Sequence, residues 1–207
     1  KVNIFKNQNT TNTISGVYHT IQMKDVFIRG NRDINKRANI LDTIEFFPGE
    51  RALDVGCNTG LLSEYLESRG CKVDGFDTDR RITIASSILA NISNKNINYY
   101  FSDLDYVQKL KKYDTIFLFS VFHHTRDYAS NARKIIESCE RIVIETRPHE
   151  RGSQPFPEEG WRVFTGWNFE NLEAMISYLE NIFVGFQLKK NHGIGDKNRY
   201  ILEFVKI

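Results

Sequence analysis

The sequence predicts an α/β protein built on a doubly wound, mostly parallel sheet. From about Arg51 onward, short apolar runs alternate with segments of helical period, as they do in βαβ units. A turn with two glycines directly follows the first apolar run, at residues 56–60. The chain then finishes in two extended segments joined by a glycine-containing loop, which is typical of an antiparallel hairpin.

Each element is assigned from its own pattern: strands from short apolar runs, and helices from apolar residues that recur every three or four positions. The expected strands are Arg51–Val55, Lys72–Phe76, Ile97–Phe101, Tyr113–Phe119, Arg141–Glu145, Ile182–Lys189 and Arg199–Lys206. The expected helices are Leu61–Ser68, Asp79–Ile92, Asp127–Glu140 and Phe169–Glu180. The helix at 79–92 is assigned from an apolar stripe that includes Ile84 and Ile88.

The first 48 residues have a pattern that differs from that of the α/β region. Residues 35–47 carry apolar side chains at helical spacing and are followed by Pro48 and Gly49, so a helix is expected there, whereas residues 1–34 show no clear period. We therefore expect an N-terminal arm and helical cover at 1–48, and one binding domain at 49–207.

Length and composition exclude several classes of protein. The chain has 207 residues, of which 41% are hydrophobic and 26% charged, so it suits one globular domain rather than a disordered, collagen-like or coiled-coil chain. No apolar run approaches a membrane span and no signal peptide is evident, so we expect a cytoplasmic protein without a membrane partner. A net charge of +2 is too small to imply wholesale binding to nucleic acid. The three cysteines never form a C-x-x-C pair, so neither a disulfide framework nor a metal site is expected.

The stretch RALDVGCNTG, at 51–60, is the most informative part of the sequence. Its glycines permit positive φ and a close approach of a ligand to the backbone, and the following helix offers free N–H groups. A dinucleotide-binding fingerprint needs glycines at Asn58 and Leu61, and a P-loop needs a final Gly-Lys-Ser/Thr; both are absent. The acid at Asp54, two residues before Gly56, instead suits the ammonium group of an amino-acid-like ligand.

Two further acids follow the next two strands, at the same carboxyl edge of the sheet. Asp77 lies 21 residues after Gly56, where a carboxylate can accept hydrogen bonds from both hydroxyls of a ribose. Asp103 follows the third strand and could accept a hydrogen bond from an adenine amino group. The three carboxylates, in strand order, could accept hydrogen bonds from an amine, a ribose and an adenine. Together they indicate an adenosyl amino acid as the ligand.

These residues carry a resemblance to a known family. The motifs LDVGCNTG, GFD, FSDLD and YDTIFLFSVFHH are similar, in this order, to those of the class I S-adenosylmethionine-dependent methyltransferases. The resemblance covers roughly residues 35–207 and implies a Rossmann-like fold with a seven-stranded sheet, whose last strand is antiparallel and lies between strands five and six. It implies S-adenosyl-L-methionine as the cofactor, although Asn58 replaces the middle glycine of the commonest family pattern. By motif, the cofactor-binding residues are Asp54, Gly56, Cys57, Asn58, Gly60, Asp77, Thr78, Asp103, Leu104, Phe119, Ser120 and Val121.

The acceptor side rests on weaker patterns. Residues 18–33 are similar to the lead-in of methyltransferases related to the enzymes that modify the tRNA wobble uridine, and of relatives that act on sugars and lipids. His19, in this arm, is a candidate covering and acceptor-binding residue by that analogy. Arg29 and Arg37 either meet a phosphate of the acceptor or belong to a solvated helix start. Arg147 and His149, just past the fifth strand, either hold an anionic or polyhydroxylated acceptor or belong to a solvated loop.

His123 and His124 follow the fourth strand, where this fold brings the acceptor close to the methyl group. A histidine is the natural general base for a hydroxyl acceptor, so either one is a candidate catalytic residue. Adjacent residues point different ways, so at most one is expected to face the site while the other packs or caps.

The predicted function is the transfer of a methyl group from S-adenosyl-L-methionine to an oxygen or nitrogen of a small molecule or sugar unit. The small chain, without an attached RNA-binding domain or a strongly basic face, favours such an acceptor. Two alternatives remain open: modification of RNA, especially tRNA, and a non-catalytic protein that only binds the cofactor.

Overall fold

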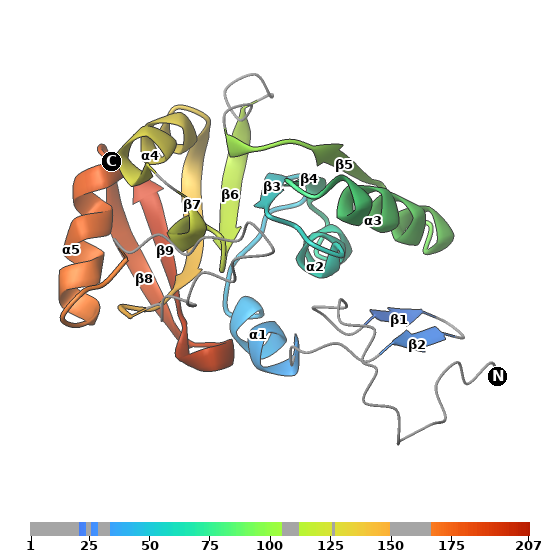
Figure 1. Cartoon of the computed structure of the whole chain (residues 1–207), viewed down its shortest axis with the longest axis horizontal. Coiled ribbons are helices and arrows are strands. Elements are labelled where there is room, and N and C mark those ends of the chain that lie inside the picture. Colours follow the sequence, from blue (N-terminus) through green and yellow to red (C-terminus); the bar gives the residue numbers. More distant parts are fainter. Residues whose placement is uncertain (1–20, 24–25, 29–33, 105–111, 126, 150–166) are drawn as a thin grey trace, which may run out of the picture.

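The computed structural model describes residues 21–23, 26–28, 34–104, 112–125, 127–149 and 167–207. A seven-stranded sheet forms its centre, and helices lie on both faces (Figure 1). The strands of this sheet are β3 (Arg51–Val55), β4 (Lys72–Asp77), β5 (Ile97–Phe101), β6 (Tyr113–Phe119), β7 (Cys139–Thr146), β8 (Phe186–Ile194) and β9 (Tyr200–Lys206). The helices are α1 (Ile34–Leu41), α2 (Leu61–Ser68), α3 (Arg80–Ile92), α4 (Tyr128–Ile136) and α5 (Leu172–Ile182). The short elements are the hairpin of β1 (Ile21–Met23) and β2 (Val26–Ile28), and the 3₁₀ turns η2 (Phe122–His124) and η3 (Asp196–Asn198).

The strand order of the sheet confirms the predicted topology. The order is β5-β4-β3-β6-β7-β9-β8, and β3 to β7 pair in parallel. Strand β9 pairs antiparallel with both β7 and β8, so β8 runs with the other strands and β9 alone runs against them. The last strand is therefore inserted between the fifth and sixth, as the family resemblance implies.

Alternate residues of the central strands feed two apolar cores, one on each face of the sheet. Along β6, Ile116 and Leu118 belong to the core beneath α4 and α5, which also contains Trp167. Phe117 and Phe119 point to the opposite core, beneath α1 and α2. This two-residue alternation is the pleat of a strand covered on both faces. The carboxyl ends of β3, β4, β5 and β6 consequently meet at one edge, held between two packed layers.

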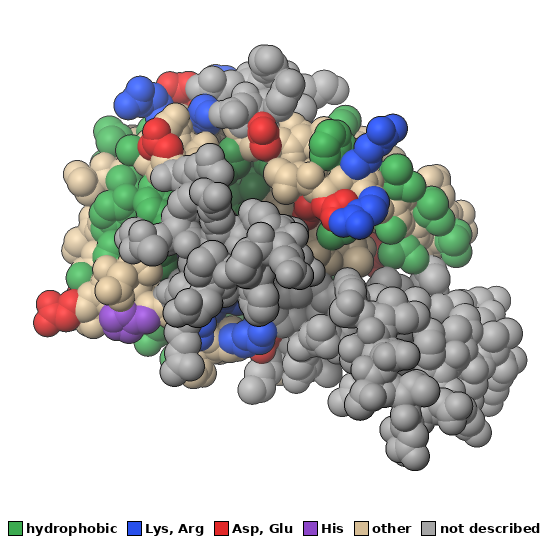
Figure 2. All heavy atoms as spheres, viewed as in Figure 1, with side chains coloured by type: hydrophobic (Ala, Val, Ile, Leu, Met, Phe, Trp, Pro, Cys, Tyr) green, Lys and Arg blue, Asp and Glu red, His purple; other side chains and the backbone are tan. Residues whose placement is uncertain are grey.

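Helix α3 turns its apolar stripe outward, contrary to a simple interpretation of its pattern. Ile84, Ile88 and Ile92 are 52%, 54% and 63% exposed, and hydrophobic side chains are visible along α3 at the right of Figure 2. The buried positions are instead the small residues Thr83, Ser86 and Ala90. Ser86 also donates to the carbonyl of Asn58 at 2.6 Å, so small side chains let this helix approach the glycine turn closely.

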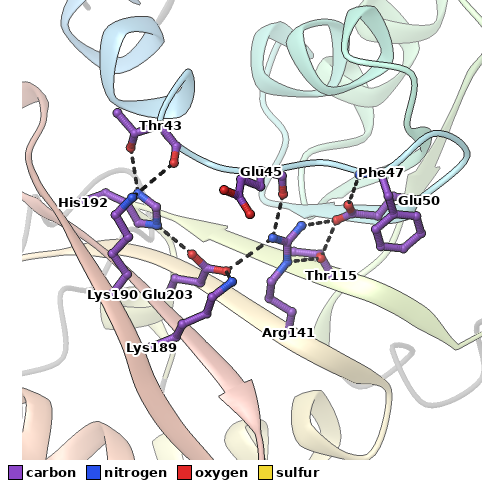
Figure 3. A network of polar contacts seen from close by, with 10 residues as sticks. All are labelled: Thr43, Glu45, Phe47, Glu50, Thr115, Arg141, Lys189, Lys190, His192 and Glu203. Carbon is purple, nitrogen blue, oxygen red and sulfur yellow. Dashed lines mark hydrogen bonds and ion pairs between the residues drawn. The ribbon is translucent and has the colours of Figure 1, made fainter.

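Helix α1 ends at Leu41, which corrects the expectation of a helix to Phe47. The carbonyls beyond it are used by side chains from distant strands: Lys190 donates to the carbonyl of Thr43 at 3.5 Å, and Arg141 donates to that of Glu45 at 2.9 Å (Figure 3). These bonds replace the intrahelical bonds that a longer helix would make. The local sequence does not predict these long-range hydrogen bonds.

Boundaries near the C-terminus also differ from expectation. The helix expected at 127–140 stops at Ile136, because β7 already begins at Cys139. Helix α5 runs on to Ile182, so β8 starts at Phe186 instead of four residues earlier. Within the residues that the structure describes, no helix combines the length and apolar character needed to cross a membrane.

Candidate functional site

A tight glycine turn follows β3 at the carboxyl edge of the sheet. The N–H groups of Gly56 and Cys57 both donate to the carbonyl of Phe76, at 2.8 and 3.0 Å, which ties the turn to the end of β4. Gly56 has a φ of 69°, and an added Cβ would lie 2.8 Å from Cγ2 of Val121. A side chain there would meet both backbone strain and Val121, so the position requires glycine. The turn therefore lies directly against the residues that follow β6.

The second glycine of the turn, Gly60, begins helix α2. It has a φ of 85°, it supplies no side-chain cap to the helix, and an added Cβ would overlap the hydroxyl of Tyr99. The buried carboxylate of Asp54 lies at this helix start instead and accepts a hydrogen bond from the Ser63 hydroxyl at 2.7 Å. A helix start that lacks a capping side chain suits an anionic group such as an amino-acid carboxylate.

Asp54 lies in an environment that favours its neutral form. Burial raises the pKa of this carboxyl to about 6, against the opposing effects of the Ser63 hydroxyl and the charge of Arg37. The side chain is only 2% exposed. A ligand ammonium close to Asp54 would favour its ionised form and lower this pKa again. The residue thus fits a cationic group, as its position before the glycine turn predicts.

Asp77, the last residue of β4, connects this strand to the glycine turn. Its Oδ2 accepts from the N–H of Asn58 at 3.1 Å, and its Oδ1 accepts from the N–H of Asp79 at 3.0 Å. Burial raises the pKa of Asp77, while these two backbone bonds oppose the shift. The backbone of Thr78 also bonds this carboxylate. The carboxylate is therefore fixed by backbone bonds at the end of β4, beside the glycine turn.

The remaining residues of the predicted cofactor site surround this turn. Thr78 and Asp103 are exposed and Leu104 is buried, and the N–H of Ser102 donates to the carbonyl of Asp77 at 3.1 Å, which brings the segment after β5 to the same edge. Cys57 is 3% exposed and burial raises its thiol pKa, so it acts as a small apolar filler and not as a nucleophile. The ends of β3, β4 and β5 thus converge as the sequence motifs predict.

Comparison with known families decides what kind of domain this is. The model of the methyltransferase domain family matches residues 30–182, well over half of the chain. The chain belongs to the methyltransferase domain family. The resemblance stated from the sequence motifs is thereby confirmed, and S-adenosyl-L-methionine is the cofactor of this family.

Individual relatives and solved structures agree with this membership. A ubiquinone biosynthesis O-methyltransferase from Coxiella burnetii is 30% identical over 96 residues, which are 46% of this chain but only 39% of that protein. The magnesium protoporphyrin IX methyltransferase of Synechocystis PCC 6803, solved with bound S-adenosylmethionine, has a TM-score of 0.62 at 19% identity, over 84% of this chain and 78% of that one. The N-terminal domain of EvdMO1, solved in the presence of S-adenosylhomocysteine and D-fucose, has a TM-score of 0.67 at 15% identity. The match covers 93% of this chain and 91% of that one. These likenesses confirm the predicted fold.

The end of β6 carries the candidate catalytic residues of this methyltransferase domain. Phe119 is buried, Val121 rests against the glycine turn, and η2 follows with both histidines. His123 is 1% exposed, whereas His124 is exposed, and their ring centroids are 4.2 Å apart. His123 therefore packs into the protein, whereas His124 is open to solvent.

The predicted acceptor-binding residues are placed only in part. Arg147 donates to the carbonyl of Lys197 at 3.2 Å, and its own carbonyl accepts from the indole N–H of Trp167 at 2.9 Å. His149 shares a hydrogen bond of 2.6 Å with Asn168. These contacts tie residues 147–149 to residues 167–168. The other two candidates, His19 and Arg29, lie outside the residues that the structure describes.

Three residues at this edge were not identified from the sequence: Ser63, Tyr99 and Arg199. Motif reasoning identifies residues close to a glycine turn or a strand end, whereas these contribute through contacts with other segments. Arg37 was expected to meet a phosphate or to lie on a solvated helix start, but it is buried and donates to Glu145, the last residue of a predicted strand.

Proposed function

We propose that this domain transfers a methyl group from S-adenosyl-L-methionine to an oxygen or nitrogen of a small molecule or sugar unit. The observation that carries the proposal is the carboxylate of Asp77, which lies beside a glycine turn without room for a side chain at Gly56. The names of the relatives support it: one is an O-methyltransferase of ubiquinone biosynthesis, and one was solved with D-fucose present.

The geometry of the turn supports the following cofactor roles in this proposal. Asp77 holds the ribose hydroxyls, the turn at 56–60 and the start of α2 hold the amino-acid part, and Asp103 accepts from the adenine amino group. When bound, S-adenosylmethionine supplies a methyl group already activated by a sulfonium. The protein therefore has little covalent work to do, and alignment of the acceptor with the methyl group is its main contribution.

His124 is the general base in this proposal. It is the exposed member of the histidine pair, and η2 places it directly after the strand whose end faces the glycine turn. A hydroxyl acceptor loses its proton as its oxygen attacks the methyl carbon, and the imidazole of His124 accepts that proton. His123, which is buried beside it, supports the ring of His124 through packing.

Acceptor selection is proposed to come from two segments of the chain. The first is residues 1–48, with His19 and Arg29, and the second carries Arg147 and His149. Such a combination of guanidinium and imidazole groups suits a polyhydroxylated or anionic small molecule.

Calorimetric titration with S-adenosylmethionine and S-adenosylhomocysteine tests the cofactor site. We expect saturable binding by the wild type and at least tenfold weaker binding by Asp77→Asn, because a neutral amide is a poorer acceptor for ribose hydroxyls. Asp74→Asn is the matched control: Asp74 lies on the same strand, bonds Asn98 and Tyr113, and should leave affinity unchanged. Equal affinities of the Asp77 variant and the wild type would refute the assigned ribose site.

The acceptor class is tested by transfer of a labelled methyl group to sugars, phenols and unmodified tRNA in parallel. The proposal expects turnover with a small hydroxylated compound that changes little between 50 and 200 mM salt. Turnover on tRNA alone, with a steep fall over that range, would instead establish the RNA alternative. Binding of S-adenosylmethionine without turnover on any acceptor would favour a protein that only binds the cofactor.

A further inference from the structure

A buried polar junction lies at the end of β6, between the cofactor edge and helix α1. Arg37 of α1 donates through Nε to Oε1 of Glu145 at 2.7 Å, and through Nη2 to both the second oxygen of Glu145 and, at 3.1 Å, the hydroxyl of Ser120. Arg199, just before β9, donates to the same hydroxyl at 3.1 Å. Glu145, Arg37 and Arg199 are 0%, 5% and 6% exposed. Four segments of the chain thus meet at one serine.

The hydroxyl of Ser120 has its hydrogen-bonding capacity filled by this junction. It donates to Glu145 and accepts from two guanidinium groups, and a hydroxyl has one proton and two lone pairs. A ligand at the cofactor edge therefore gains no contact from this side chain unless the junction breaks. The motif-based prediction that Ser120 binds the cofactor can then concern only its backbone.

The backbone of Ser120 is held in an unusual conformation. Its φ is 57°, in the left-handed region that residues other than glycine rarely adopt. Its N–H donates to the carbonyl of Glu145 at 3.1 Å, so Glu145 binds Ser120 through both side chain and backbone. Surrounding contacts that over-determine a strained residue are what allow it to persist.

The two neighbours of Ser120 connect it to the cofactor edge. Val121 lies against Gly56, close enough to exclude any side chain there. Phe119 lies beneath the guanidinium of Arg37, whose Cζ is 5.6 Å from the ring centroid. A change in the backbone angles at Ser120 would therefore move Val121 relative to the glycine turn.

From these contacts we infer that Glu145 and Arg37 are positioning residues for the cofactor site. They hold Ser120 in its left-handed conformation and thereby set the path of residues 119–121 against the glycine turn. Helix α1 is then part of the binding site through Arg37, and not only a cover over it. This inference rests on the proposed function, because it assumes that S-adenosylmethionine binds beside Gly56.

Four variants separate backbone positioning from stability: Glu145→Gln, Ser120→Ala, Ser120→Gly and the control Glu203→Gln. Glu203 is also a buried carboxylate that bonds an arginine, but it lies on β9 among Arg141, Lys189 and His192. The melting temperature of each variant is measured first. The dissociation constant of each variant for S-adenosylmethionine is then measured by calorimetry, well below that temperature.

We expect Glu145→Gln and Ser120→Ala to weaken binding at least tenfold. Ser120→Gly should lose less than threefold, because glycine adopts the same φ without strain and so needs no junction to hold it. Glu203→Gln should lower the melting temperature and change affinity less than twofold.

Lowered melting temperatures with unchanged affinity in Glu145→Gln and Ser120→Ala would overturn the inference, since the junction would then only stabilise the fold. Equal losses in Ser120→Gly and Ser120→Ala would also overturn it, because the conformation of the backbone would not matter. If Glu145→Gln does not fold, the difference in affinity between Ser120→Ala and Ser120→Gly still tests the inference. No binding by folded wild-type protein would overturn the proposed function itself.

Discussion

Val121 occupies the space that a side chain at Gly56 would need. Cγ2 of Val121 would lie 2.8 Å from an added Cβ, although the two residues belong to the ends of different strands, β6 and β3. This contact brings the segment with the histidines against the glycine turn. It links the place where the cofactor is proposed to bind with the place where the acceptor is proposed to react.

Gly56→Ala should abolish measurable binding of S-adenosylmethionine while the protein still folds. The new methyl group would push Val121 away and strain a backbone with a φ of 69°. Gly185→Ala is the matched control, because Gly185 has a φ of 83° but no atom within 4 Å of an added Cβ. That variant should lose about 1 kcal/mol of stability and bind the cofactor normally. Normal binding by Gly56→Ala would show that the turn tolerates a side chain and does not touch the ligand.

The affinity for S-adenosylmethionine should rise with pH up to about 6 and then level off. Burial raises the pKa of Asp54 to about 6, and a ligand ammonium favours the ionised carboxylate, so binding releases a proton below that pH. The increase cannot exceed tenfold per pH unit for one proton, as linkage requires. Calorimetry at several pH values measures it. Asp54→Asn should bind more weakly and show a flatter profile, whereas an unchanged profile in this variant would assign the proton to another group.

Replacement of His124 by alanine should lower kcat on a hydroxyl acceptor by about 10²- to 10⁴-fold, the usual contribution of a general base. The affinity of this variant for S-adenosylmethionine should not change, because His124 is not proposed to contact the cofactor. His123→Ala removes a ring that is 1% exposed, so its main effect should be a lower melting temperature. Rate measurements against pH discriminate the two: only the His124 variant should lose a basic group from the profile. The opposite result would make His123 the base.

The network around Glu203 should make stability depend on pH (Figure 3). Its carboxylate accepts from His192 at 2.8 Å, Lys189 at 3.1 Å and Arg141 at 3.3 Å. Burial opposes ionisation, but the hydrogen bonds from His192 and Lys189 prevail and lower the pKa of Glu203 below its usual value. For a depressed pKa, the stabilisation is present above the unfolded value and is lost as pH falls through the folded value.

Glu203→Gln should therefore unfold about 2 to 3 kcal/mol more easily at pH 7. The difference from the wild type should shrink as the pH falls through the lowered pKa of Glu203, where the native carboxylate also becomes protonated. Urea unfolding at pH 7 and pH 3 measures both values. An equal difference at the two pH values would show that the loss comes from packing and not from the charge.

The cysteines should resist alkylation in the folded protein. Cys57, Cys71 and Cys139 are all buried, and burial raises the pKa of each thiol, to about 12 for Cys71 and Cys139. The reactive thiolate is therefore scarce at pH 8. Mass spectrometry after treatment with iodoacetamide should find unmodified native protein and three alkylated cysteines in urea. Rapid modification of native Cys57 would show that the glycine turn opens readily.

The local pattern of the sequence determined the fold and the position of the glycine turn. The strands at 51–55, 97–101 and 113–119 have the bounds that their apolar runs predict, and the helix at 61–68 has those that its period predicts. A buried strand is a run of apolar residues, and a tight turn requires glycine, so both leave signals within a few neighbouring positions. The acid at Asp77 follows from the same logic, because it ends a strand beside that turn.

Only the tertiary structure decided which distant side chains meet. Arg37 and Glu145 are 108 positions apart, and no local period connects them. The apolar stripe of α3 faces outward because the small residues of this helix pack against the protein. Helix α1 ends at Leu41, and a carbonyl beyond it accepts a hydrogen bond from a distant side chain. The division between His123 and His124 was decided in the same way, since packing chooses which of two adjacent rings is buried. Contacts of this kind are set when the layers pack, and a linear pattern does not record them.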